Sequence, residues 1–360
     1  MPAINKPVDG FDRPTDGYDP LTLYQMVPLG ESREMAVNTN DVKAELSFTV
    51  PDICRMSNFR VVRQSTASLF PLPGPGVSVN RIALPENSTV AFTLEGIGIG
   101  KTVLRGLDRV PAGGRPTLRD FSLRVSVKGP KRHLYAVCYV FDRINIDTGR
   151  RLDLPGIFRV MNEIYKQANT TMSSIDNGRT LELDGSFGRF FRLGDTQLVS
   201  RLIAAFEARH PQIFDIVKTV IFAFPVPLGV INRRTGSVVD SENIGIGRAV
   251  RRARDGRIFD TAFLSSIIHD NLENAPDTVA HEVGHRLGLR HEPDLRGEVR
   301  LRDFPGFDPR DPRPFRFTPA SMHNLMFPID IMGSRRLNGE QIETLHEDLA
   351  GTPDQEFIEI

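Results

Sequence analysis

The alternation of apolar and polar positions divides the chain into two parts. Residues 1–20 are rich in proline, aspartate and glycine and have little periodic apolar content, which predicts a flexible tail. Between residues 21 and 130, short alternating segments separated by turn residues predict strands at 42–50, 59–72, 77–84, 89–94, 102–107 and 121–127. Several short strands at this spacing predict a β-sandwich domain over residues 21–130.

After Gly129 and Pro130 the pattern changes to alternating strands and helices. Near-continuous apolar runs predict buried strands at 134–141 and 217–224, with a further strand at 179–183. Helical spacing of apolar residues predicts helices over 154–168 and over 195–208, the second capped by Asp195. The chain is therefore expected to be multidomain, with an α+β domain of a twisted mixed sheet and helices over residues 131–360.

A further amphipathic helix is expected over residues 275–287. Val279, Ala280, Val283 and Leu287 form an apolar stripe, whereas His281 and His285 lie across the axis from it. Proline at position 276 and an acid at position 277 suit the first turn of a helix. One face is therefore expected to pack and the other to carry chemistry.

A sequence motif starts in the second half of that helix. Residues 281–291 fit H-E-x-x-H-x-x-G-x-x-H at every fixed position. Residues four apart on a helix point the same way, so His281 and His285 can reach one ion. Gly288 falls where the helix must end, and glycine can adopt the left-handed backbone that a sharp turn needs. The turn is expected to bring His291 back as a third ligand.

Three imidazoles suit one catalytic Zn²⁺ and leave a fourth position for water or substrate. Zinc lowers the pKa of a bound water, and Glu282 is placed to take the proton as general base and to return it as general acid. Peptide-bond hydrolysis is the reaction that this set predicts. Calcium in asparagine- and aspartate-rich turns is possible, but nothing in the sequence supports it.

The motif resembles that of the metzincin clan of zinc endopeptidases. Residues 324–328, Asn-Leu-Met-Phe-Pro, look like the methionine-containing turn of that clan, with Met326 beneath the metal, and residues 337–349 resemble its last helix. Glu292 is astacin-like and Phe327 is matrixin-like, so the mixture indicates a separate family. The resemblance implies a zincin catalytic domain in which residues 257–268 form the edge strand and a protein or peptide substrate binds in extended form.

Composition narrows the partners. The chain has 360 residues, 40% hydrophobic and 25% charged, with a net charge of zero, which argues against a nucleic-acid partner. No stretch approaches the ~20 apolar residues of a membrane span. The first residues also lack the apolar core of a secretory signal, which predicts a cytoplasmic protein or one exported by a signal-independent route, such as a secreted effector.

The two cysteines, Cys54 and Cys138, exclude a disulfide scaffold. Cys54 is expected to be a packed thiol, and less so a thiolate that keeps the zinc latent, because the residues around it lack the matrixin switch motif. The module at 21–130 weakly resembles bacterial immunoglobulin-like modules, which leaves a partner for it possible. Sequence does not reveal that partner, the natural substrate or the oligomeric state.

The sequence thus predicts a zinc metalloendopeptidase in which His281, His285 and His291 bind the metal, Glu282 is catalytic, and Gly288 and Met326 support the site. Two alternatives stay open. In one, the N-terminal module performs binding or delivery and the zinc site is a vestige, although a structural zinc has no need of Glu282. In the other, the zinc site hydrolyses a non-peptide amide, which a short cleft would favour.

Overall fold

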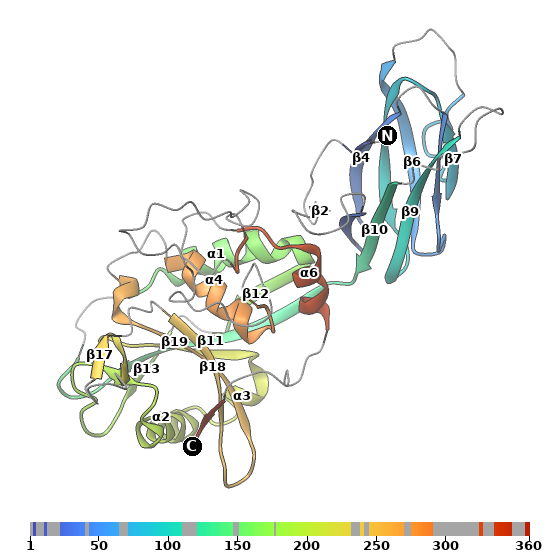
Figure 1. Ribbon diagram of the computed structural model, residues 1–360. Helices are drawn as coiled ribbons and strands as arrows, with labels where there is room; N and C mark the ends of the chain where they lie inside the picture. The colour runs from blue at the N-terminus through green and yellow to red at the C-terminus, as the bar shows by residue number, and fades with distance from the viewer. Residues whose placement is uncertain are drawn as a thin grey trace, which may run out of the picture. The chain divides into compact units, whose positions relative to one another are not determined.

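The computed structural model describes residues 3–4, 11–12, 22–39, 43–64, 71–109, 121–146, 151–175, 178–231, 238–240, 245–269, 275–290, 324–326, 335–347 and 357–360. The chain divides into two compact units (Figure 1). The first unit comprises Met1–Lys131, Gln167–Asn169 and Leu337–His346, and the second comprises Arg132–Lys166, Thr170–Arg336 and Glu347–Ile360. The first division falls within one residue of the boundary expected at 130.

The first unit is built on a β-sandwich. One sheet has the order β1 (Ala3–Ile4), β4 (Ser32–Thr39), β8 (Ser88–Gly96), β6 (Cys54–Gln64). The other has the order β2 (Phe11–Asp12), β3 (Thr22–Pro28), β10 (Phe121–Lys128), β9 (Gly100–Arg109), β5 (Lys43–Phe48), β7 (Arg81–Leu84). Alternate side chains of both sheets, among them Phe92 and Leu46, meet in one buried core. The sandwich predicted from the strand pattern is therefore present.

Two parts of this unit differ from the sequence prediction. The strand pattern begins at residue 42, but β3 and β4 precede it and pair with β10 and β8. The segment 1–20, expected to be a flexible tail, contributes the two-residue strands β1 and β2, which pair with β4 and β3. Such short strands are stabilised by pairing with distant segments, so local patterning does not reveal them.

Cys54 packs inside the sandwich. It is fully buried within the core of the first unit, and burial raises the pKa of its thiol to about 12. A thiol in this state is a poor thiolate ligand. The prediction of a packed thiol is confirmed. Cys138 is also fully buried, in strand β11 (Lys131–Phe141) of the second unit.

The first unit also contains a helix from late in the chain, α6 (Gly339–His346), which corrects the expectation that residues 131–360 form one continuous domain. The ring of Tyr24 lies where a side chain on Gly339 would be, with its Cγ 2.8 Å from the position of a Cβ. The hydroxyl of Tyr24 donates to Glu343 over 2.9 Å, and Lys128 and Lys101 approach the same carboxylate at 2.6 and 2.9 Å. The helix is held by charge as well as by packing.

The Glu343 contacts predict an acid-sensitive first unit. Burial raises the pKa of Glu343, but hydrogen bonds from Lys128, Ser126 and Lys101 outweigh it and lower that pKa from 4.5 to about 2. A carboxyl pKa that is lower in the folded than in the unfolded state stabilises the fold at pH values above the unfolded pKa. This contribution, roughly 3 kcal/mol, is lost as the pH falls from about 4.5 towards 2. Glu343→Gln should flatten the dependence of unfolding free energy on pH in that window.

Urea unfolding at a series of pH values measures this effect. Glu340→Gln, which alters an exposed glutamate of the same helix, is the matched control. If Glu343→Gln and Glu340→Gln chains lose stability in parallel as the pH falls, the assigned role of Glu343 is wrong.

The second unit contains a mixed sheet. Its order is β12 (Thr170–Ser174), β11, β15 (Thr219–Ala223), β19 (Ile258–Leu264), β18 (Gly245–Arg251), β20 (Phe357–Glu359), and β13 (Arg179–Glu182) also pairs with β11. Strands β11, β15 and β19 are parallel, whereas β18 runs antiparallel to β19. A smaller sheet joins β14 (Phe191–Arg192), β16 (Leu228–Ile231) and β17 (Val238–Asp240).

Helices cover both faces of the large sheet (Figure 1). Alternate residues of β11, such as Cys138 and Val140, share a core with Leu202 and Phe206 of α2 (Thr196–Arg209). On the opposite face, α1 (Leu154–Tyr165) packs against α4 (Ala275–Arg286), and Tyr135 of β11 meets Phe158 of α1. Shorter helical turns are η1 (Lys166–Ala168), α3 (Ile213–Ile216) and η2 (Ser266–His269). The helices predicted over 154–168, 195–208 and 275–287 are therefore present.

The expected edge strand is wrong. Residues 258–264 form β19, which pairs on both sides, with β15 and with β18. Beyond β19 lie β18, which contains Arg248 and Arg251, and then β20, the outermost strand of the described sheet on this side. In β18, glycine alternates with apolar and basic residues, a pattern that is not typical of a buried strand. Gly245 and Gly247 allow this strand to pack closely against α4.

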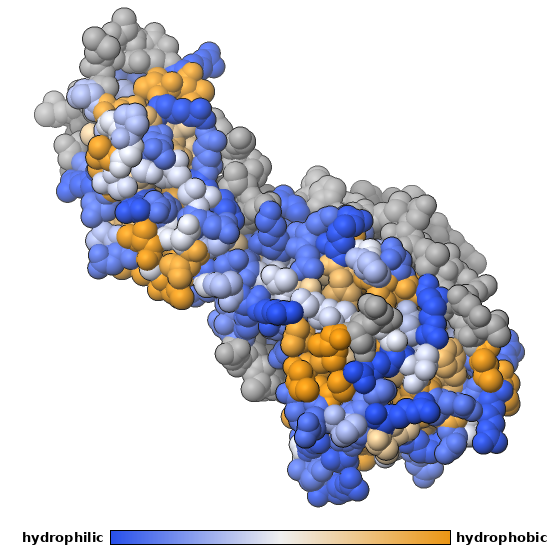
Figure 2. Space-filling model, turned by 180° about the vertical axis from the view of Figure 1, so that it is seen from behind, coloured by the Kyte–Doolittle hydropathy of each residue, from blue (hydrophilic) through white to orange (hydrophobic). Residues whose placement is uncertain are grey.

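No helix in the described part of the chain is both long and apolar enough to cross a membrane. On the face drawn in Figure 2, apolar side chains gather in separate patches between hydrophilic ones.

Candidate metal centre

Helix α4 carries the H-E-x-x-H residues and is fixed along its length. Its first turn contains Pro276 and Asp277, as predicted, and Arg335 holds the buried Asp277 carboxylate through contacts of 2.7 and 3.3 Å. The hydroxyl of Tyr165, on α1, donates to the carbonyl of Ala280 over 2.7 Å. The stripe of Val279, Ala280, Val283 and Leu287 is buried, so the apolar face packs as expected.

His281 and His285 lie together on the partly exposed face of the helix, with ring centroids 4.8 Å apart. Nδ1 of His281 donates to the carbonyl of Leu325 over 2.8 Å, and Nδ1 of His285 donates to the carbonyl of Leu289 over 3.1 Å. A carbonyl only accepts, so each neutral ring carries its proton on Nδ1 and its lone pair on Nε2. Histidine ligands are commonly oriented in this way, by a hydrogen bond from the second ring nitrogen.

The turn after α4 supplies the partner of His285. Gly288 has a φ of 87°, the left-handed backbone predicted for it. The amide of Leu289 donates to the carbonyl of Gly284, and that of Gly288 to the carbonyl of His285, over 2.9 and 3.1 Å. This pair of bonds is a Schellman motif. It places the Leu289 carbonyl against the His285 ring, so Gly288 orients that ring through the backbone.

The turn at residues 324–326 lies beneath the helix. Met326 is fully buried, and its amide donates to the side chain of Asn324 over 2.8 Å. A Cβ on Gly284 would lie 2.7 Å from the Met326 sulfur, so the sulfur occupies space that a side chain at position 284 would fill. The turn therefore contacts α4 twice, through this sulfur and through the Leu325 carbonyl on His281. The structure thus brings Met326 against α4, and its place beneath a bound metal stays a prediction.

Strand β18 holds the carboxylate of Glu282 from the other side. Glu282 is 8% exposed, and its Oε2 accepts from the amide of Gly247 over 2.7 Å. A Cβ on Gly247 would lie 2.7 Å from the Glu282 carbonyl, and one on Gly245 would lie 2.7 Å from its Cγ. Only glycine permits this approach of strand to helix. The carboxylate is therefore fixed by backbone rather than left to rotate in solvent.

The last turn of α4 is fixed to the sheet by an ion pair. Arg286 is buried, and its Nε donates to Oδ1 of Asp260, on β19, over 3.1 Å. Because Arg286 follows His285 directly, this pair limits rotation of the helix end that carries the second histidine. A buried arginine needs such a partner to offset its desolvation.

The donors present suit a zinc ion. Two imidazoles with lone pairs on Nε2 and a carboxylate between them in sequence form the first part of a three-histidine set. His291, the expected third ligand, lies outside the described residues. Among the residues that are described, no group of three or more histidine, cysteine, aspartate or glutamate side chains is placed to hold a metal ion. The fit therefore rests on His281 and His285.

Sequence reasoning missed the groups that orient these residues. Tyr165, Asp260 and the Leu325 carbonyl come from distant segments, and no local pattern connects them with α4. The glycines of β18 did leave a signal. Residues 245–247, Gly-Ile-Gly, place two glycines on one face of a strand, which indicates close approach of another backbone.

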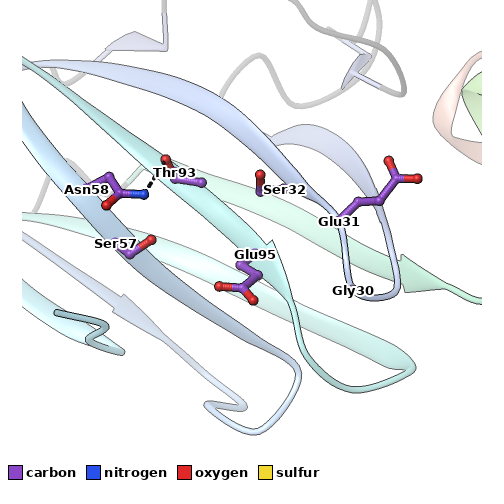
Figure 3. Close-up of a pocket in the computed structure, with 7 residues that line it drawn as sticks. All are labelled: Gly30, Glu31, Ser32, Ser57, Asn58, Thr93 and Glu95. Atoms are coloured by element: carbon purple, nitrogen blue, oxygen red, sulfur yellow. Dashed lines mark hydrogen bonds between the residues drawn. The ribbon is translucent and has the colours of Figure 1, made fainter. Parts of the chain in front are cut away.

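A second candidate site lies on the sandwich. A depression of about 420 Å³ is lined by polar side chains of β4, β6 and β8 and the turn at Gly30, including Glu31, Asn58 and Glu95 (Figure 3). Arg55 binds Glu95 through two contacts of 2.8 and 2.9 Å, and Asn58 donates to Thr93. Its two carboxylates, Glu31 and Glu95, are both paired with arginines. The depression is therefore a weaker candidate for a functional site than α4, because its carboxylates are already neutralised by arginines.

Comparisons with known proteins identify no family. No family model matches the sequence, and no curated protein matches it. Similar solved structures include Amebosin, with 17% identity over 29% of this chain and 88% of that chain and a TM-score of 0.20. The cysteine protease inhibitor EhICP2 from Entamoeba histolytica has 16% identity over 29% and 85%, also with a TM-score of 0.20. Scores this low carry no argument about fold or function.

Because β18 lies so close to α4, a single methyl group added at Gly247 should destabilise the fold. Gly247→Ala places a carbon against the Glu282 carbonyl, which is backbone and cannot move aside alone. We expect a loss of roughly 1–3 kcal/mol in unfolding free energy. Gly194→Ala is the matched control, because a Cβ there meets nothing within 4 Å. Equal urea midpoints for the two variants would refute the packing described for this contact.

Proposed function

We propose that this protein is a zinc-dependent endopeptidase, with His281, His285 and His291 as the metal ligands. The observation that carries the proposal is the pair of backbone carbonyls, from Leu325 and Leu289, that accept from Nδ1 of His281 and His285. Both hydrogen bonds leave Nε2 as the basic nitrogen, as a metal ligand requires. A surface helix that carried histidines by chance would not have both rings fixed by backbone in this way.

Each side chain has a defined task in this proposal. Zinc, when bound, acidifies a water and polarises the scissile carbonyl. Glu282 accepts the proton of the attacking water and returns it to the leaving amine. The Gly247 amide holds one oxygen of Glu282, so the carboxylate does not need to be ordered during the reaction. Met326 and Gly288 keep α4 and its following turn in place.

Peptides are proposed as substrates because β18 lies beside the catalytic carboxylate. In the described part of the chain β20 pairs with β18 from Ala249 to Arg251, and the stretch of β18 beside Glu282 precedes that pairing. A strand edge there would bind extended peptides through backbone hydrogen bonds, whichever side chains they carry. The rival functions, a vestigial zinc site in a binding or delivery protein and hydrolysis of a non-peptide amide, require no such strand. The presence of Glu282 also disfavours a vestige.

The decisive measurement is cleavage of casein by the purified chain, together with its zinc content. Glu282→Ala should keep stoichiometric zinc and lose cleavage by a factor of at least about 10² to 10⁴, the usual contribution of a general base. Glu163→Gln, an exposed glutamate of α1 paired with Arg159, is the control and should leave both unchanged. Cleavage by the parent chain should stop when a chelator is added.

Each result has a clear meaning. Cleavage by the Glu282→Ala chain at the parental rate would rule out the mechanism. Bound zinc without any cleavage of casein would favour the vestigial site, and cleavage of acylated small amides alone would favour the non-peptide hydrolase. A parent chain that binds no zinc would overturn the proposal as a whole.

A further inference from the structure

The strand β18 that holds Glu282 is itself paired with a second strand on its outer side. Strand β20 lies parallel to it, with Ala249 opposite Phe357, Val250 opposite Ile358 and Arg251 opposite Glu359. Figure 1 shows this strand in dark red beside β18. The segment that follows α6 in the chain therefore forms part of the sheet that contacts the candidate active-site helix.

Several kinds of contact hold β20 in place. The Ile360 amide donates to the Arg251 carbonyl over 2.9 Å, and the Ala253 amide donates to the Ile360 carbonyl over 2.8 Å. Arg251 pairs with Glu359 at 2.7 Å and covers the ring of Phe357, with its guanidinium carbon 4.1 Å from the ring centroid. Ile358 packs against the core beneath α2. The strand is bound through backbone, charge and apolar contacts together.

The register places this strand close to the catalytic carboxylate. Glu282 is held by the amide of Gly247, and β20 begins to pair at Ala249, two residues further along β18. An extended peptide that added to β18 beside Glu282 would meet β20 there. Its backbone would have to leave the sheet, because the hydrogen-bonding edge from Ala249 to Arg251 is already used.

We propose that β20 is a specificity-determining segment, which limits the length of extended peptide that can lie along β18 on one side of the scissile bond. The substrates would accordingly be peptides, or chain ends, with few residues on that side. This inference rests on the proposed function. A strand that merely covers the sheet edge against aggregation would also pair with β18, but it would not alter the choice of substrate.

The ion pair between Arg251 and Glu359 allows a reversible test. In the double variant Arg251→Cys, Glu359→Cys, a disulfide replaces the ion pair and locks β20 on β18 when oxidised. The native Cys54 and Cys138 are buried and stay out of the exchange. The probes are quenched fluorogenic peptides built on a bond cleaved in casein and extended one residue at a time on either side.

In the oxidised variant we expect kcat/KM to fall roughly tenfold when the peptide is extended past the limit on one side only, and reduction should remove most of that fall. The control is Arg55→Cys, Glu95→Cys, which converts the equivalent in-register pair of the sandwich and should show no such dependence on redox state. Identical length profiles for the oxidised and reduced forms of the first variant would overturn the inference.

A second measurement separates this inference from the proposed function. A chain that ends at Glu356 lacks β20, and a fluorescein-labelled peptide with the sequence of residues 351–360 is added to it. Fluorescence anisotropy should show saturable binding, which the oxidised double variant lacks. Absence of chelator-sensitive cleavage in every variant would defeat the proposed function alone, whereas absence of peptide binding to the shortened chain would defeat the role given to β20.

Discussion

The site depends on one constraint, the approach of β18 to α4 at Gly245 and Gly247. There the strand backbone lies so close that a methyl group would meet Glu282 at 2.7 Å. Two consequences follow from this contact. The Gly247 amide reaches the Glu282 carboxylate, and strand β18 comes to lie beside that carboxylate. A larger residue at either position would separate both from the helix.

The side chains of His281, His285 and Glu282 are oriented mainly by backbone groups. Leu325 and Leu289 offer carbonyls to the two histidines, and Gly247 offers an amide to the glutamate. Backbone groups move little once their turns are formed, so the orientation of these side chains depends on the conformation of the turns. This explains why glycine occurs at 247, 284 and 288, where the constraint is the absence of a side chain or a left-handed φ.

The difference between prediction and structure follows from the range of each interaction. The spacing of apolar residues predicted most sandwich strands and the helix that carries His281, because the burial of one face of an element determines which residues are apolar within that element. The partners of that helix were not revealed, since Tyr165, Asp260 and Gly247 reach it from other segments. The edge strand was misplaced for a related reason. β19 carries the stronger apolar pattern and pairs on both sides, whereas the outermost strand, β20, is short and pairs with a segment about 100 residues earlier in the chain.

The first unit is not one continuous segment of the chain, because it includes Leu337–His346 as well as Met1–Lys131. A cut after residue 131 would separate Lys128 and Tyr24 from Glu343, although all three belong to the first unit. The half-buried Glu343 would lose the cations that offset its desolvation, and the ring of Tyr24 would lose its packing against Gly339. Because α6 belongs to the sandwich unit, the segment that follows the methionine turn is bound to strands from the start of the chain. The sandwich is therefore part of the folding of that segment rather than a removable appendage.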